Sequence, residues 1–445
     1  MKNREKIKSK SGGVRISIVG SGYVGLVSGV CFAEIGHRVI CVDNNREKIR
    51  KLRKGIAPIY EPGLEELLKK NIKNGRLSFS DSIKKAVPSS EAIFIAVNTP
   101  PRSDGSCDLQ FVEAVSREVA LSMNGYKVII EKSTVPARTG RKIKQTVKIY
   151  NRKNLPFDVV SNPEFLREGK AIGDFLKPDR IVVGVESKKA EALMRRIYGP
   201  LKAPFIVTNI ETSELIKHAS NSFLAAKISF TNEVANVAER LGADIKDVSR
   251  AMGLDKRIGA QFLDAGIGFG GSCFAKDVLA FIHMAKTAGI ELKMLKEVYR
   301  INERQRFVVI EKLKEIIWNI EGKKIAVWGL AFKPDTDDLR NAPAIDIIKE
   351  LLSSNANVCV YDPKAMPGFR KIFKGVKKLK YASSPSDAVK GADALLLLTE
   401  WEMFAKADMK KVKTFMKVPA LIDGRNLYDK EKMKKLGFIY RGIGR

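Results

Sequence analysis

The chain is poor in cysteine and histidine, and this shortage argues against two kinds of site. Its 445 residues include five cysteines, which are widely spaced and form no CxxC pair, so a disulfide framework is not expected. None of the three histidines has metal-ligand spacing to a cysteine or to another histidine. We therefore expect no bound metal ion, and no motif supports a histidine-centred catalytic triad.

Long apolar runs are scarce as well. The densest one, residues 394–398, is far shorter than the roughly 20 residues of a membrane-spanning helix. Residues 1–10 are basic and lead into an expected strand, with no apolar signal region or small-residue cleavage site. These features predict a cytoplasmic protein without a membrane partner.

Acidic residues are few relative to basic ones. Lys and Arg number 80 against 50 Asp and Glu, which gives a net charge of +30. Such a charge could serve a nucleic acid or an anionic substrate, or reflect a lysine-rich host composition. The basic residues are scattered through the whole chain, as on a solvated surface, so we expect no specific nucleic-acid binding. We assign no function to most of this excess positive charge.

Short apolar runs alternate with helical patterns in the first half of the chain. This alternation predicts an α/β fold, a parallel sheet covered by helices in a doubly wound, Rossmann-like domain. The strands expected there are residues 14–20, 38–42, 92–97 and 127–130, with weaker candidates at 159–160 and 181–185.

The pattern changes at residue 212. Residues 212–241 contain no Gly or Pro and predict one long helix, and a helical region continues to about residue 318. Strand-like runs then return at residues 324–329, 358–362 and 392–399. We expect three domains, with two Rossmann-like domains (1–211 and 321–445) joined by a central helical domain (212–320).

The first expected strand ends in a dinucleotide-binding fingerprint. Residues 20–25 read GSGYVG, a GxGxxG pattern between a strand and a helix, and Asp43 follows at the end of the next strand. An acid at this position binds the adenosine ribose hydroxyls and repels a 2′-phosphate, which favours NAD over NADP, although the nearby Arg46 and Lys48 weaken that preference. The cofactor-binding residues expected here are Gly20, Gly22, Tyr23, Val24, Gly25, Asp43 and Lys48.

A second glycine-rich segment, residues 268–277 (GFGGSCFAKD), carries a candidate nucleophile. Cys273 stands three residues before Lys276 and four before Asp277, so the three share a face if a helix begins here. A helix N-terminus and a nearby lysine favour the thiolate. The alternative is a buried structural cysteine, the role that we expect of Cys31, Cys41, Cys107 and Cys359.

With these two glycine-rich segments, the sequence resembles the UDP-glucose 6-dehydrogenase family, within the wider UDP-glucose/GDP-mannose dehydrogenase group. The resemblance covers nearly the whole chain, and the joint order of its short segments is specific. Besides the Cys273 loop they are 20–27 (GSGYVGLV), 97–100 (VNTP), 131–136 (EKSTVP), 162–169 (NPEFLREG), 214–221 (ELIKHASN), 329–340 (GLAFKPDTDDLR), 399–404 (TEWEMF) and 423–426 (DGRN).

The resemblance implies a four-electron oxidation in which two NAD molecules in succession take the C6 alcohol of the sugar to a carboxylate. It implies that Cys273 holds the aldehyde as a thiohemiacetal, which is oxidised to a thioester and hydrolysed. Lys217 and Asn221 match the family's pair near the reacting oxygen, and Asp277 matches a carboxylate that activates water or the alcohol. Glu164 matches the base for thioester hydrolysis, and Thr134 matches a residue that helps to hold the water.

The family match also implies the binding residues and a homodimer formed through the long helix, with Arg257 reaching a neighbour's site. On the cofactor side it implies Thr99, Thr134, Glu168, Lys276 and Arg340. On the substrate side it implies Glu164, Phe165, Leu166, Lys217, Asn221, Arg257, Phe262, Leu263, Gly270, Lys333 and Arg425.

The loop around the cysteine favours UDP-glucose as the sugar nucleotide. Family members that act on N-acetylated sugars tend to carry His before the cysteine, where this chain has Ser272. A UDP-N-acetylhexosamine remains the alternative substrate, and GDP-mannose dehydrogenases fit less well. Ala137 and Arg138 depart from the family pattern, as does the N-terminal extension. A catalytically inactive scaffold is disfavoured, because the complete set of reactive residues is retained.

Overall fold

The computed structural model describes residues 13–445, so the basic N-terminal extension lies outside the described residues. The described residues form two compact units, one of residues 13–220 with 279–288 and one of residues 221–278 with 289–445. Each unit contains one sheet, and both contribute to the long helix α9 (Ile210–Leu241). The expected α/β fold with two Rossmann-like sheets and a long central helix is therefore confirmed.

The first unit has an eight-stranded sheet in the order β3-β2-β1-β4-β5-β6-β7-β8. Its pairs are parallel except for β6 and β7, which meet antiparallel at Ser161 and Gly184. The strands are β1 (Arg15–Val19), β2 (Arg38–Val42), β3 (Leu77–Ser80), β4 (Ala92–Ile95), β5 (Lys127–Glu131), β6 (Phe157–Ser161), β7 (Ile181–Gly184) and β8 (Phe205–Thr208).

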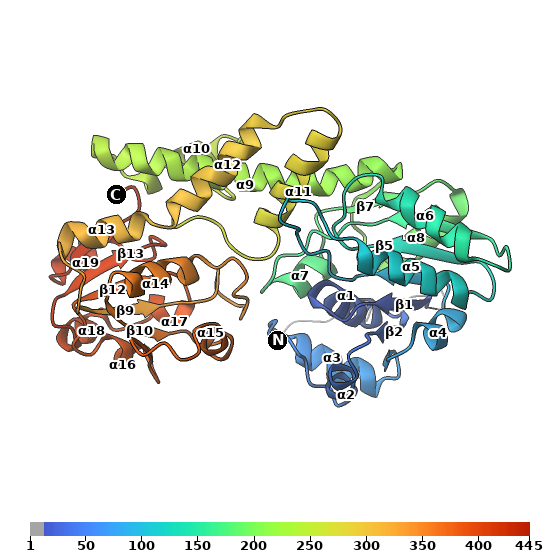
Figure 1. Cartoon of the computed structure of the whole chain (residues 1–445), viewed down its shortest axis with the longest axis horizontal. Helices are drawn as coiled ribbons and strands as arrows, with labels where there is room; N and C mark the ends of the chain where they lie inside the picture. Colours follow the sequence, from blue (N-terminus) through green and yellow to red (C-terminus); the bar gives the residue numbers. More distant parts are fainter. Residues whose placement is uncertain (1–12) are drawn as a thin grey trace. The chain divides into compact units, whose positions relative to one another are not determined.

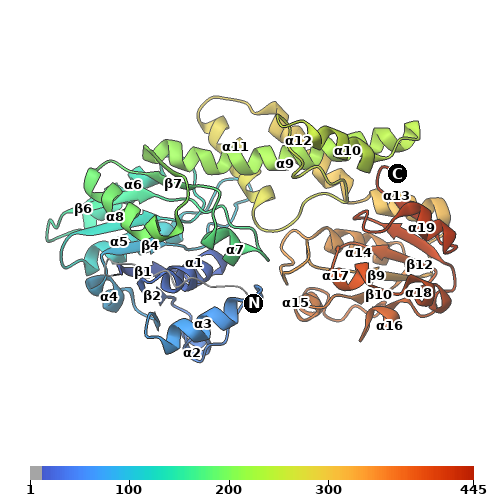
Figure 2. The same ribbon diagram turned by 180° about the vertical axis from the view of Figure 1, so that it is seen from behind.

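Helices cover both faces of this sheet (Figure 1 and, from behind, Figure 2). Side chains alternate along a strand, so Ile18 and Phe94 pack into one core while Val19 and Ile93 pack into the other. The first core is completed by α1 (Tyr23–Glu34), α2 (Arg46–Arg53), α3 (Leu64–Lys73), α7 (Ala171–Leu176) and α8 (Lys188–Tyr198). The second is completed by α4 (Ile83–Ala86), α5 (Gln110–Ser122) and α6 (Thr139–Tyr150).

The second unit has a six-stranded parallel sheet in the order β11-β10-β9-β12-β13-β14. Its central strand β9 carries the fully buried Trp328, whose ring stacks on Phe404 at 5.0 Å. The strands are β9 (Lys324–Trp328), β10 (Asn357–Tyr361), β11 (Leu379–Tyr381), β12 (Ala394–Leu397), β13 (Ala420–Asp423) and β14 (Ile439–Gly442).

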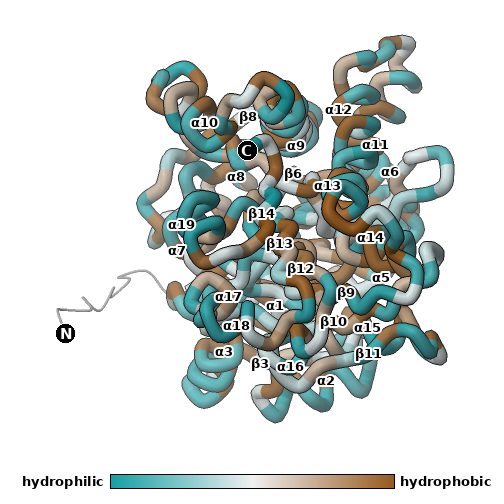
Figure 3. The backbone as a smooth tube through the Cα atoms, turned by 90° about the vertical axis from the view of Figure 1, so that its left-hand side faces the viewer, coloured by the Kyte–Doolittle hydropathy of each residue, from teal (hydrophilic) through white to brown (hydrophobic). Residues whose placement is uncertain are grey.

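The helices of this unit are more polar than its strands. In Figure 3 the strand β12 (ALLL) is mainly hydrophobic, whereas α19 (KEKMKK) is mainly hydrophilic. The helices are α10 (Ile245–Leu254), α12 (Lys293–Gln305), α13 (Val308–Ile316), α14 (Pro343–Ser353), α15 (Met366–Ile372), α16 (Pro385–Val389), α17 (Glu402–Ala405), α18 (Met409–Phe415) and α19 (Lys430–Lys435). Helix α11 (Phe274–Thr287) begins in the second unit and ends in the first.

The sequence located the central strands and the long helix but missed several strands of each sheet. The missed strands are β3, β8, β11, β13 and β14. Each has three or four residues, and none stands out as an apolar run that is long enough to be told from a loop. No helix within residues 13–445 combines the length and the apolar character that crossing a bilayer requires.

Candidate functional site

The fingerprint glycines occupy the turn between β1 and α1 for steric reasons. Gly20 has φ of +101°, and a Cβ on it would lie 2.3 Å from the carbonyl oxygen of Ala96. A Cβ on Gly25 would lie 1.9 Å from the carbonyl oxygen of Gly20. At Gly22, the residue before α1, a Cβ would meet nothing closer than 3.9 Å. The backbone is therefore open to a ligand at Gly22, where a pyrophosphate approaches the helix N-terminus.

The acid at the end of β2 is held in its ionised form. Asp43 accepts hydrogen bonds from the backbone N–H of Ser21 (3.0 Å) and from Lys48 Nζ (2.7 Å). Partial burial alone would raise the pKa of Asp43, but these bonds and one from Asn45 N–H lower it below its usual value. Lys48 therefore lies beside Asp43, while Arg46 Nε lies 3.6 Å from Asp81 Oδ2. The arrangement fits the adenosine ribose of NAD.

Tyr23 joins the fingerprint to a residue that sequence reasoning missed. Its hydroxyl donates to the buried carboxylate of Glu61, which also accepts from the backbone N–H groups of Gly169 (2.7 Å) and Ala171 (2.8 Å). Burial raises the pKa of the Tyr23 hydroxyl, and Glu61 raises it further. Glu61 therefore anchors the segment that follows Glu168. A single glutamate between two helices gave no spacing signal by which to find it.

Glu164 and Lys217 form a buried ion pair in the first unit. Lys217 Nζ on α9 lies 3.2 Å from Glu164 Oε1, and Glu164 Oε2 accepts from the backbone N–H of Leu166 at 2.6 Å. The same ammonium lies 5.3 Å from the centre of the Phe165 ring. The arrangement supplies a carboxylate base and a cation at one point, the combination that acyl hydrolysis uses.

A second buried lysine supports this pair and was not predicted. Lys132 Nζ donates to the carbonyl oxygen of Asn162 (3.3 Å) and to its side-chain oxygen (3.2 Å), two residues before Glu164. Burial lowers the pKa of Lys132 to about 8, although Glu164 opposes the shift. Nearby, the Thr99 hydroxyl donates to the carbonyl oxygen of Thr134 at 2.9 Å, so these two predicted residues are in contact. Glu168 is buried.

The cysteine of the second glycine-rich segment stands directly before α11. Its carbonyl oxygen accepts from the backbone N–H of Asp277 at 2.9 Å, so the expected helix start is confirmed. Cys273 is partly exposed, whereas the other four cysteines are buried, and none of these five described residues is joined in a disulfide bond. A thiol at a helix N-terminus is placed to react as the thiolate.

Three predicted residues meet at the buried carboxylate of Asp277. Asn221 Nδ2 donates to Asp277 Oδ2 at 2.6 Å, and Lys276 Nζ lies 2.9 Å from Asp277 Oδ1. Asn221 is buried on α9, four residues after Lys217. Lys276 and Asp277 therefore follow Cys273 within the first turn of α11, and Asn221 on α9 donates to the Asp277 carboxylate.

The remaining predicted binding residues of the second unit lie in several different settings. Arg425 donates to the carbonyl oxygens of Leu398 and Phe332 (both 2.9 Å) and so ties three segments together. Phe262 packs edge-on against Phe274, the residue after the cysteine, at 6.1 Å. By contrast, two arginines lie on the surface as ion pairs, Arg340 with Asp338 and Arg257 with Asp255. Leu263 and Gly270 are buried, and Lys333 is partly exposed beside the Phe332 ring.

Within residues 13–445 no group of three or more His, Cys, Asp or Glu side chains is arranged to hold a metal ion.

Comparison with known proteins places these features in one family. The UDP-glucose/GDP-mannose dehydrogenase family matches the chain with its NAD binding domain at residues 14–202, its central domain at 211–304 and its UDP binding domain at 326–430. The chain is 47% identical to the UDP-glucose 6-dehydrogenase TuaD of Bacillus subtilis, over 97% of this chain and 93% of that protein. It is 46% identical to the UDP-glucose 6-dehydrogenase of Rhizobium meliloti, over 97% and 100%.

Solved structures of nucleotide-sugar dehydrogenases are also similar to the chain over nearly its whole length. A UDP-glucose dehydrogenase from the hyperthermophilic archaeon Pyrobaculum islandicum superposes with a TM-score of 0.92 at 39% identity, over 99% of this chain and 100% of that one. A UDP-D-ManNAc dehydrogenase from Pyrococcus horikoshii gives a TM-score of 0.86 at 29% identity, over 97% and 99%.

Proposed function

The chain belongs to the UDP-glucose/GDP-mannose dehydrogenase family, and from this premise we propose that it oxidises UDP-glucose to UDP-glucuronate with two molecules of NAD. The observation that carries the proposal is the setting of Cys273, a partly exposed thiol at the start of α11 and one turn before the buried Asp277. A dehydrogenase without a nucleophile stops at the aldehyde, whereas a thiolate retains the aldehyde for a second oxidation.

In the first oxidation the chain's residues remove a proton from the C6 hydroxyl. Asp277, which Asn221 orients through its 2.6 Å hydrogen bond, accepts that proton through water or directly. Lys217 stabilises the negative charge that develops on the oxygen. NAD, when bound at the fingerprint, supplies the acceptor for the hydride that leaves C6. The product is the aldehyde.

In the second oxidation the Cys273 thiolate adds to the aldehyde carbon and forms a thiohemiacetal. Lys217 and Asn221 stabilise its oxyanion, and loss of a second hydride leaves a thioester. Glu164 then removes a proton from a water held by Thr134, and the hydroxide attacks the thioester carbon. The C–S bond breaks, the carboxylate leaves, and the thiolate is regenerated. In sum, one alcohol and one water give one carboxylate, two hydrides and three protons.

The other predicted residues bind the two ligands in this proposal. Lys333 and Arg425 contact the diphosphate or the sugar of the substrate, because cations suit phosphate. Phe165, Leu166, Phe262, Leu263 and Gly270 line the substrate site. Thr99, Glu168, Lys276 and Arg340 serve the cofactor.

We also propose a homodimer built on α9, within three domains at residues 1–211, 212–320 and 321–445. Phe223, Phe230 and Val237 recur every seven residues on α9 and are 65%, 54% and 56% exposed. A large apolar stripe of this kind fits a second helix. A second copy of the chain would cover the stripe, and the exposed Arg257 would reach into the partner's site.

We place the reaction in the cytoplasm. The five cysteines are few and widely spaced and form no CxxC pair, a usage that is typical of a reducing compartment. NAD and nucleotide sugars are also anionic, and the chain's net charge of +30 would speed their arrival.

A substrate panel tests the proposal. The purified protein is given NAD with UDP-glucose, UDP-N-acetylglucosamine or UDP-N-acetylmannosamine in separate reactions, and NADH is followed by absorbance. Turnover with UDP-glucose alone supports the proposal. Turnover with only an N-acetylated sugar refutes the choice of substrate and establishes the alternative, and no turnover with any of the three refutes the proposed activity.

A further inference from the structure

The last turn of helix α12 buries polar side chains where a helix normally buries apolar ones. Asn302 has no exposed surface, and Gln305 and the adjoining Arg306 are 2% and 3% exposed. Burying polar groups costs several kcal/mol unless each finds a partner, so the partners of these three side chains explain why they are there.

Asn302 binds the backbone of the loop that leads to the cysteine at two points. Its Oδ1 accepts from the N–H of Phe269 at 2.7 Å, and its Nδ2 donates to the carbonyl oxygen of Phe269 at 3.1 Å. The loop lies directly against the amide, because a Cβ on Gly268 would stand 2.6 Å from Asn302 Oδ1. Gly268 has φ of +84°, a conformation that glycine adopts without strain.

The backbone of Gly266, three residues before Phe269, is bonded in a similar way. Gln305 Nε2 donates to its carbonyl oxygen at 2.9 Å, and Asn232 Oδ1 on α9 accepts from its N–H at 2.8 Å. Asn236 completes the chain of amides by donating to Gln305 Oε1 at 3.1 Å. Both backbone groups of Gly266 and both of Phe269 are therefore bonded to buried amide side chains.

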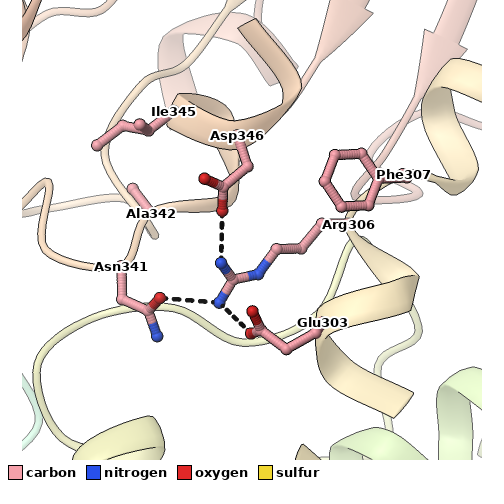
Figure 4. Close-up of a pocket in the computed structure, with 7 residues that line it drawn as sticks. All are labelled: Glu303, Arg306, Phe307, Asn341, Ala342, Ile345 and Asp346. Carbon is pink, nitrogen blue, oxygen red and sulfur yellow. Dashed lines mark hydrogen bonds and ion pairs between the residues drawn. The ribbon is translucent and has the colours of Figure 1, made fainter. Parts of the chain in front are cut away.

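Arg306 binds a second segment in the same manner, the turn that contains Asn341. Its guanidinium donates to Asn341 Oδ1 at 2.9 Å and pairs with Asp346 (2.5 Å) and Glu303 (2.8 Å), beside a cavity of about 510 Å³ (Figure 4). A Cβ on Gly270 would lie 2.6 Å from the carbonyl oxygen of Asn341. The turn that Arg306 fixes therefore packs against the loop that Asn302 fixes.

We propose that Asn302, assisted by Gln305, is a positioning residue that fixes the backbone of residues 266–271 and thereby the place of the Cys273 thiol. Four of these six residues are glycines, Gly266, Gly268, Gly270 and Gly271. Such a segment gains much conformational freedom when it is not bonded to its surroundings. A nucleophile reacts fast only when it is held in its attacking geometry. The catalytic consequence rests on the proposed function, whereas the order of the loop does not.

Asn302→Ala tests the proposal by two readouts, amide hydrogen exchange of the intact protein and steady-state kinetics. We expect exchange at residues 266–269 to quicken at least tenfold, with exchange in the first unit unchanged. We expect kcat to fall at least tenfold, with the KM for NAD unchanged because the fingerprint lies in the other unit. Arg304→Ala is the matched control, since Arg304 is exposed on the same turn and its side chain pairs with Glu297 on the helix surface. It should leave both readouts at the wild-type values.

Wild-type exchange at residues 266–269 in Asn302→Ala would overturn the proposal, as would faster exchange with an unchanged kcat. If Asn302→Ala does not fold, Gln305→Ala is measured by the same readouts, and at least a threefold change in each is expected. Exchange is measured without substrate. A wild-type protein that fails to oxidise UDP-glucose would therefore refute the proposed function, while the exchange rates would still decide whether Asn302 orders the loop.

Discussion

The ammonium of Lys217 lies 3.2 Å from Oε1 of Glu164, and the two side chains expose only 5% and 6% of their surfaces. Charges so far from water attract each other strongly, but each costs several kcal/mol to desolvate. Removing one member leaves the other charged, buried and without its counterion. This pair therefore links the stability of the first unit to the chemistry proposed for it.

Lys217→Met should lower the free energy of unfolding by about 3 kcal/mol and reduce kcat by about 100-fold, the usual cost of losing one oxyanion-stabilising group. Urea unfolding and NADH absorbance measure the two effects. The double variant Lys217→Met/Glu164→Gln is the control, because it removes both charges. It should regain most of the lost stability and remain inactive. Equal stabilities of the single and double variants would contradict this account of the pair.

The buried carboxyl of Glu131 should make the free energy of unfolding depend on pH. Burial raises the pKa of this wholly buried carboxyl from 4.5 to about 8; hydrogen bonds from Ser133 oppose the shift and the nearby Glu214 adds to it. Between pH 4.5 and 8 the folded state keeps a proton that the unfolded state has lost, so the free energy of unfolding falls as pH rises.

Glu131→Gln removes that dependence and keeps an oxygen for the 2.7 Å bond from the Ser133 N–H. Its stability relative to wild type should rise from near zero at pH 4.5 to several kcal/mol at pH 8, at about 1.4 kcal/mol per pKa unit. Urea titrations at pH 5, 6.5 and 8 measure the difference. Glu113→Gln, at an exposed position on α5, should show none. A difference that does not vary with pH would argue against a protonated Glu131.

Asp43 and Lys48 together should set the choice between NAD and NADP. Asp43→Asn removes the charge that binds the ribose hydroxyls and leaves Lys48 without its acidic partner. We expect the KM for NAD to rise about tenfold, the factor for one charged hydrogen bond, and the relative kcat/KM for NADP to increase. Adding Lys48→Met should abolish the gain with NADP. An unchanged cofactor preference in Asp43→Asn would contradict the role assigned to the acid.

The apolar stripe on α9 predicts how the oligomeric state changes when one charged side chain is introduced into it. Phe230→Glu should convert the proposed dimer to a monomer in sedimentation velocity, because a carboxylate would be buried between two helices. Lys410→Glu, at an exposed position on α18, adds a negative charge elsewhere and should leave the dimer intact. A dimeric Phe230→Glu protein would place the interface on another surface.

The sequence predicted the parts of the fold that have a strong local pattern. The strands at 38–42 and 324–328 and the long helix at 210–241 were located because an unbroken apolar run or the lack of Gly and Pro marks them. The strands β8 and β14 were missed, since each has four residues and neither forms an apolar run that is long enough to be told from a loop. The same holds for the site. Residues that lie in a recognisable motif, such as Asp43 and Cys273, were predicted from the sequence. Glu61, Lys132 and Asn302 act through contacts with distant backbone, which no spacing in the sequence reveals.

The most direct test of the account counts NADH against limiting UDP-glucose. With excess NAD, the wild-type protein should form two NADH per UDP-glucose, and Cys273→Ser should lose steady-state turnover because no thioester can form. One NADH per sugar from the wild-type protein, or two at the wild-type rate from Cys273→Ser, would contradict a four-electron oxidation through Cys273.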